Sequence, residues 1–271
     1  MTVTATAAPT RPAPVPAALA PSAALLPSLG AVYRAQLSRA RVARIPLLFV
    51  ATFQSLGIMV MMRGVVGTGP GDAGAARDVV AGSSVLVVAF VALNLLAQYF
   101  GRLRASGGLD HYATLPVPAA SVVLGTAAAY ASFTVPGVLV TAAVGCTLFT
   151  LAWVHLWILV LVVPLSGAAL AGVGAACGLL ANRQEIATLL GQLGMSAALL
   201  LGVLPASHMP QGIQWMRDLL PSTYAVDALA RTFAARPDWS AVGLDLAVCA
   251  AVGVVSLALS TWAYRRAATR T

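Results

Sequence analysis

The side chains able to do chemistry in this 271-residue chain are few and scattered. The chain has three cysteines and three histidines: Cys146, Cys177, Cys249, His111, His155 and His208. Neither set has the spacing of a zinc site, a disulfide framework or a metalloprotease helix. We therefore expect buried apolar cysteines, histidines at span ends or in loops, and no metal centre.

Composition also excludes nucleotide hydrolysis by this chain. All 16 basic residues are arginine, so the lysine of a phosphate-binding loop is missing. Ion-coupled transport needs carboxylates at membrane depth. The nearest candidate is Asp245, at the start of the last apolar run, and we expect it to face water at the outer end.

The apolar runs predict an all-α integral membrane protein. Hydrophobic residues make up 59% of the chain and charged residues 9%, with a mean hydropathy of +0.88. Six runs approach the length of about 20 residues that a membrane-spanning helix needs. They are Ile45–Met62, Val79–Phe100, Ser121–Thr150, Val154–Ala181, Ile186–Leu204 and Val242–Tyr264. The first is the weakest, because Gln54 and Gly57 interrupt it.

Arginine placement orients the six predicted spans. With a cytoplasmic amino terminus, the inner side receives eleven arginines and two acids, and the outer side five arginines and six acids. This asymmetry follows the positive-inside rule, so both termini are predicted to be cytoplasmic. The inner arginines are Arg11, Arg34, Arg39, Arg41, Arg44, Arg102, Arg104, Arg183, Arg265, Arg266 and Arg270. Basic residues with this role do not indicate a nucleic-acid partner.

Two segments precede the first span. Residues 1–28 are rich in Ala and Pro and lack the apolar core of a signal peptide, so we expect a disordered cytoplasmic tail, with a membrane domain over 29–271. Next, Leu29, Val32, Leu37 and Val42 alternate with arginines, a pattern typical of an amphipathic helix on the cytoplasmic surface. A plain, positively charged membrane anchor is the alternative.

The outer loop Pro205–Trp239 predicts two short amphipathic helices broken at Pro221. The first has Ile213, Met216 and Leu220 at helical spacing; the second has Val226, Leu229, Ala230 and Phe233. Asp227 and Arg231 lie four residues apart on the polar side of the second. Such helices are too short to span, so we expect them in the outer interface or dipping back between spans.

The stretch "SGGLDHYATLPVPAASVVLG", Ser106 to Gly125, is a polar insert between the second and third predicted spans. Gly107 and Gly108 permit a sharp exit from the membrane, and two prolines stiffen the return. Leu109 and Tyr112 supply side chains that a partner protein can bury. An ordinary connector is the alternative.

Together these features resemble the permease subunit of ABC-2 type exporters, the family of daunorubicin-type drug efflux permeases, over about Tyr33 to Arg266. Two motifs carry the resemblance. In the inner turn, the matching residues are Gly108, Leu109, Asp110, Leu115, Pro116, Val117, Leu124 and Gly125. In the outer loop they are Pro221, Tyr224, Asp227, Leu229 and Arg231. The chain departs from the family at Arg102 and Arg104, where an acidic residue is common.

The resemblance implies specific partners and sites. A coupling helix, Gly108, Leu109, Asp110, His111, Tyr112, Leu115 and Pro116, would sit in a groove of a separate ATPase subunit. Pro221, Tyr224, Asp227 and Arg231 would form an outer cap. ATP and Mg²⁺ would bind the partner and no cofactor this chain. Two permease copies, as a homodimer in a bacterial plasma membrane, would work with two ATPase subunits to export an amphipathic drug, antibiotic or lipid.

Two other classes remain as alternatives. An ion-coupled secondary transporter often has two similar halves, and no such repeat is visible. A membrane-embedded lipid-modifying enzyme should show several acids, or a His/Asp cluster, at one membrane face. Within the spans, Gly174 and Gly178 lie four residues apart and predict close helix packing. Asn94 and Gln98, with three other glutamines, either tie helices together or line a path.

Overall fold

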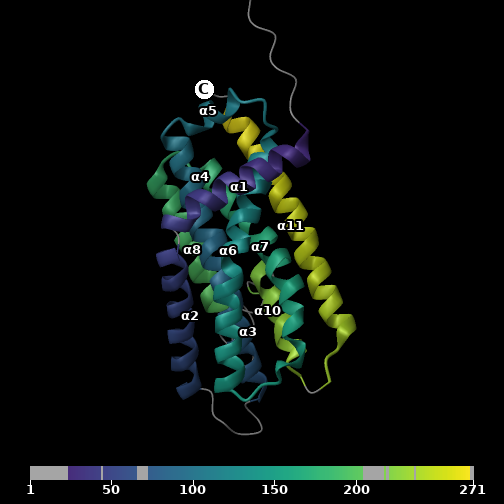
Figure 1. Cartoon of the computed structure of the whole chain (residues 1–271). Helices are drawn as coiled ribbons and strands as arrows, with labels where there is room; N and C mark the ends of the chain where they lie inside the picture. Colours follow the sequence, from purple (N-terminus) through teal and green to yellow (C-terminus); the bar gives the residue numbers. More distant parts are fainter. Residues whose placement is uncertain are drawn as a thin grey trace, which may run out of the picture.

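The structure, a computed structural model, describes residues 24–43, 45–65, 73–203, 217, 220–234 and 236–268, and these fold as a helical bundle (Figure 1). The elements are α1 (Leu25–Ala43), α2 (Ile45–Val65), α3 (Ala73–Ala89), η2 (Phe90–Leu95), α4 (Leu96–Ala105), α5 (Gly108–Ala113), α6 (Ala119–Leu148), η3 (Trp153–Ile158), α7 (Leu159–Leu180), α8 (Gln184–Val203), α10 (Pro221–Thr232) and α11 (Trp239–Ala268). The predicted tail lies outside the described residues up to position 23, and α1 begins at Leu25. Most of the first predicted outer helix also lies outside them.

In the described part of the chain, five helices are long and apolar enough to cross a membrane, which confirms an all-helical, multi-pass membrane protein. They are Ala73–Ala105, Ala119–Leu148, Trp153–Leu180, Gln184–Val203 and Trp239–Ala267. The first predicted span is the exception. Within α2 the apolar segment is Leu48–Gly64, shorter than the usual spanning length of about 20 residues.

Helix α1 lies across the bundle near one end, the end that also holds α5 and the last turns of α11 (Figure 1). It packs on α6, where the Leu29 carbonyl oxygen and Val32 both lie 3.0 Å from the position that a Cβ would take on Gly125. Val32 is buried and Leu29 and Leu37 are half-buried, as expected of an amphipathic helix. The buried face also includes the polar side chain of Gln36, which the apolar pattern did not reveal.

The α3–α4 span is at the centre of the bundle, in contact with α6, α7 and α8. Its hydrogen bonding changes to a π-helix at η2, a local widening of the helix that is often found at functional positions. Gly174 of α7 approaches η2 so closely that a Cβ there would lie 2.1 Å from the Ala92 carbonyl oxygen. At Gly178 the corresponding distance to the Ala97 carbonyl oxygen is 2.4 Å. The predicted close packing through these two glycines is therefore present.

Candidate functional site

The insert between the second and third predicted spans is helical, as α5, and follows a sharp turn. Gly107 has φ = 69°, a left-handed conformation that glycine adopts without steric cost. The Ser106 and Gly107 amides donate to the Arg102 and Arg104 carbonyl oxygens and so close the end of α4. The predicted role of glycine in the exit from the span is thus met at Gly107.

The burial of the side chains in the insert differs from the prediction. Leu109, expected to be available to a partner, is 4% exposed and belongs to the hydrophobic core of the bundle. Tyr112 is half-buried and packs against the same core. The reason is that α5 lies back on α4 and α11 instead of projecting from the bundle. For Asp110 and His111, the structure describes the backbone within α5 but not the side chains.

An exposed apolar edge follows α5 directly. Leu115 is 40% exposed and Pro116 is also exposed. The Leu115 amide donates to the Tyr112 carbonyl oxygen at 3.3 Å, and the Val117 amide donates to the Leu115 carbonyl oxygen at 2.7 Å, so this turn is ordered by its own backbone. Of the apolar side chains predicted for this site and described by the structure, Leu115 and Pro116 are the exposed ones.

Arg104 has a structural role at this end of the bundle. Its Nη1 donates to the carbonyl oxygens of Leu179, at 2.6 Å, and Ala181, at 3.0 Å. These carbonyls at the carboxyl end of α7 have no partner within the helix, and a cation there also complements the helix dipole. Arg104 therefore fixes α4 against α7.

At the other end, α10 is buried within the bundle in contact with α3, α7, α8 and α11 (Figure 1). Of the two expected placements for this helix, the structure has the one in which it dips between the spans. Pro221 is its first residue, a position where the missing amide hydrogen costs nothing. Tyr224 is half-buried against the core.

The charges of α10 are paired with other elements. Asp227 forms an ion pair with Arg217, and Arg231 Nε lies 3.0 Å from Asp245 Oδ2 of α11. Asp227 and Arg231 therefore each have a partner other than their neighbour four residues away. The prediction that Asp245 faces water is wrong, because this residue is 8% exposed and lies against Arg231.

Arg217, Asp227 and Arg231 border a hollow of about 380 Å³. Its lining residues are Gly74, Arg77, Asp78, Arg217, Asp227, Ala230, Arg231 and Ala234. The ion pairs connect α10 to α11 and to Arg217, so they fix α10 within the bundle at the end opposite α5. The sequence signal was the spacing of the arginines and aspartates, but it could not reveal which charges would pair.

Asp238 begins α11 outside the span. Its Oδ1 accepts hydrogen bonds from the Ser240 hydroxyl at 2.6 Å and from the Ser240 and Ala241 amides at 3.1 and 3.3 Å. These donors, led by the Ser240 hydroxyl, hold the pKa of Asp238 below its usual range. The helix therefore begins at a carboxylate that satisfies its free amides.

No group of three or more His, Cys, Asp or Glu side chains in the described part of the chain is placed to hold a metal ion. His155 packs edge-on against Trp239 with ring centroids 5.5 Å apart. Trp157 stacks on the same Trp239 ring at 5.7 Å. These aromatic residues form a cluster at the turn between α6 and α7, a composition typical of a membrane interface.

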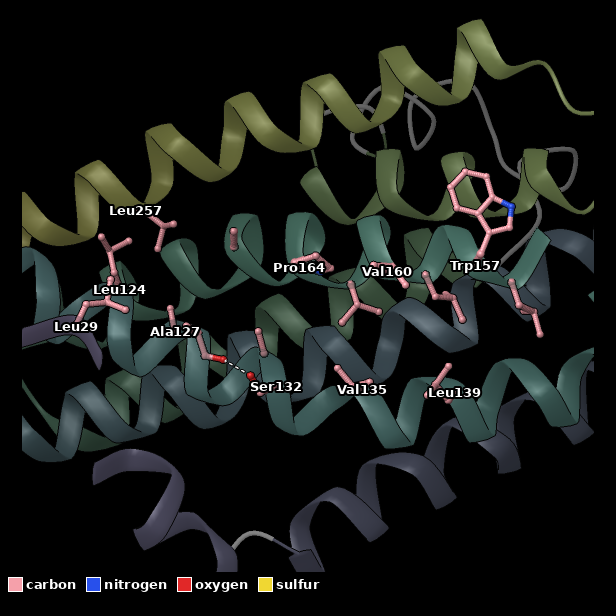
Figure 2. Close-up of a pocket in the computed structure, with 16 residues that line it drawn as sticks. Leu29, Leu124, Ala127, Ser132, Val135, Leu139, Trp157, Val160, Pro164 and Leu257 are labelled. Atoms are coloured by element: carbon pink, nitrogen blue, oxygen red, sulfur yellow. Dashed lines mark hydrogen bonds between the residues drawn. The ribbon is translucent and has the colours of Figure 1, made fainter. Parts of the chain in front are cut away.

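A long apolar groove lies between α6 and α7 (Figure 2). Its volume is about 810 Å³, within the range of about 300–1,000 Å³ that is typical of small-molecule sites. The floor includes small residues, Ala127, Ala131 and Ala168, while the larger side chains of Val160 and Trp157 are exposed on the rim. One hydroxyl lines it, that of Ser132, which is already hydrogen-bonded to the Tyr33 hydroxyl and the Ala128 carbonyl oxygen. The groove was not predicted from the sequence.

The fold and these sites define a class of protein: a multi-pass helical membrane protein with a short helix between two spans at one end and a buried amphipathic helix at the other. Residues 29–233 match the family model of the ABC-2 type transporter. The chain therefore belongs to the ABC-2 type transporter family, and it is a membrane permease component and not the ATPase. Permeases of this family pair with ABC ATPase subunits, so membership sets aside the secondary-transporter and lipid-enzyme alternatives. No curated protein matches the chain.

Proposed function

We propose that this permease exports an amphipathic substrate across a bacterial plasma membrane, as two permease copies with two ATPase subunits, and that the ATPase docks at α5. The observation that supports docking most directly is the ordered, exposed edge of Leu115 and Pro116 beside α5. Two copies are needed because about six spans make only half of the usual ABC membrane domain.

Charge supports a cytoplasmic location for the α5 end. Arg34, Arg102, Arg183, Arg265 and Arg266 belong to segments at this end (Figure 1). The opposite end holds Asp78, Asp227 and Asp245, which offset its arginines. By the positive-inside rule, both termini and α5 are then cytoplasmic and α10 is near the outer surface.

The function is tested by co-expressing the permease with its cognate ABC ATPase subunit and purifying the pair through a tag on the permease. We expect equal amounts of the two subunits and the mass of a two-plus-two assembly by light scattering. A permease that transports substrate alone, or an assembly with one permease copy, contradicts the proposal. Membrane vesicles containing the pair should concentrate the substrate only when ATP is supplied.

The substrate class is inferred from the groove between α6 and α7 (Figure 2). From Leu124 to Leu139, both on its wall, α6 rises about 22 Å at 1.5 Å per residue, which suits an extended alkyl chain. The walls are nearly all hydrocarbon, and the hydroxyl of Ser132 already has partners. A ligand held here must therefore gain its affinity from apolar area, as an amphiphile with an alkyl part does.

Filling the groove should weaken binding of such an amphiphile. Ala128 lines the groove and is exposed, so Ala128→Trp adds an indole there without displacing core side chains. We expect at least about a tenfold loss of affinity for an alkyl-chain photoprobe, because most of the contact area is removed. The matched control is Ala247→Trp on α11, which is exposed and does not line the groove. Equal labelling of both variants would exclude the groove as the alkyl site.

A further inference from the structure

A buried amide links α1 to the rest of the bundle. Gln36 is 1% exposed, although α1 lies across the surface of the other helices. Its Nε2 donates to the Tyr99 hydroxyl oxygen of α4 at 2.6 Å. Burying a side-chain amide is costly unless it is hydrogen-bonded. This bond therefore fixes how α1 sits against α4.

Tyr99 joins this bond to α5. Its hydroxyl is also hydrogen-bonded to the hydroxyl of Tyr112. A tyrosine hydroxyl has one donor and can accept as well, so it can serve both neighbours at once. The chain of side chains Gln36, Tyr99 and Tyr112 thus runs from α1 through α4 to α5.

Aromatic packing holds the middle of this chain in place. The Tyr99 ring packs edge-on against Phe100, with centroids 5.2 Å apart, and is tilted against Tyr130 of α6 at 6.0 Å. Phe100 and Tyr130 are both buried. A displacement of Tyr112 therefore acts on a ring with little freedom to turn, and the strain passes to the hydrogen bond with Gln36.

The helices at the two ends of this hydrogen-bonded series, α5 and α1, differ in their packing. Helix α5 has six residues, and Leu109 and Tyr112 fix it to the core. Helix α1 packs on α6 and is followed by α2. If a movement of α5 displaces Gln36, it therefore also acts on α6, against which α1 packs, and on α2, which follows α1.

We propose that Tyr99 is a positioning residue that transmits displacement of α5 to α1, through its hydrogen bonds to Tyr112 and Gln36, when the ATPase subunits close. This inference rests on the proposed docking of the ATPase at α5. It adds the route by which that docking changes the membrane helices. A static strap between α1 and α4 would need the same bond to Gln36 but would not depend on Tyr112.

The test uses the assembled permease and ATPase in lipid vesicles. Tyr99→Phe keeps the ring packing and removes both hydrogen bonds, while Tyr112→Phe removes only the bond on the α5 side. We expect both variants to bind the ATPase normally and to hydrolyse ATP within about twofold of wild type. Transport per ATP hydrolysed should fall about fivefold or more, because the variants lose the free energy that couples α5 to α1. Combining Tyr112→Phe with Gln36→Leu should reduce it no further, since both interrupt one chain.

The matched control is Tyr33→Phe. It removes another tyrosine hydrogen bond of α1, to Ser132 of α6, at an exposed site. Normal transport per ATP in Tyr99→Phe would overturn the inference, and so would an equal loss in Tyr33→Phe, which would indicate general anchoring of α1. Normal coupling in Tyr112→Phe alone would favour the static strap and overturn it too. If wild-type permease fails to bind the ATPase, the proposed function fails instead, so the two failures are distinguishable.

Discussion

Replacing Gly174 by alanine is expected to prevent the bundle from packing correctly, although it adds one methyl group. The new Cβ would lie 2.1 Å from the Ala92 carbonyl oxygen and 3.1 Å from Leu93 Cα. Both are backbone atoms of η2, so no flexible side chain can move aside. Overpacking typically costs about 1–3 kcal/mol, and this contact, made with the backbone of η2, belongs at the upper end.

The measurement is the thermal unfolding midpoint of the purified permease in detergent. We expect Gly174→Ala to lower it by about 6 °C or more, taking about 2–4 °C per kcal/mol, or to abolish monodisperse protein. Gly253→Ala should change it little, because its Cβ would meet Ala168 Cβ at an ordinary 3.4 Å. Gly57→Ala meets nothing within 4 Å and replaces a poor helix former, so it should be neutral or stabilising. Equal midpoints for the three variants would contradict the packing argument.

Much of this fold is encoded in local patterns, which the sequence displays directly. The length of each apolar run predicts a span, and five of the runs form helices of spanning length. The short segment Leu48–Gly64 is the one that Gln54 and Gly57 interrupt, so its weakness was visible too. Glycine spacing on α7 predicted close approach, because the absence of a Cβ is a local property.

The parts that could not be predicted depend on which helices meet. Leu109 has the same apolar character whether it contacts a partner protein or the core of its own chain, and the choice is made by how α5 lies on α4 and α11. Likewise, Asp227 pairs with Arg217 and Arg231 with Asp245 because the fold brings α10 and α11 together. Gln36 was missed because an amide among arginines indicates a solvent-facing position unless its partner, Tyr99, is known.

Because Leu109 is buried and Leu115 is exposed, mutations at these two residues should affect the stability of the permease differently. Leu109→Ala removes a side chain from the core, which typically destabilises a protein by about 2–5 kcal/mol. We therefore expect it to lower the thermal midpoint of the isolated permease, before any partner is added. Leu115 is 40% exposed, and substitution of exposed residues usually changes stability by less than about 0.5 kcal/mol. Leu115→Ala should thus leave that midpoint unchanged.

For binding of the ATPase, we expect the opposite order of effects: Leu115→Ala should weaken binding more than Leu109→Ala. If Leu115 is an anchor of the interface, its removal costs about 2 kcal/mol or more, a weakening of binding of roughly 30-fold. The measurement is the dissociation constant of the ATPase subunit for permease in lipid nanodiscs, made beside the thermal midpoint of each variant. Ala105→Ser, an exposed change at the end of α4, provides a control for surface substitution at this end of the bundle. A Leu115→Ala permease that binds as tightly as this control would show that the exposed edge is not the docking anchor, whatever Leu109 does to stability.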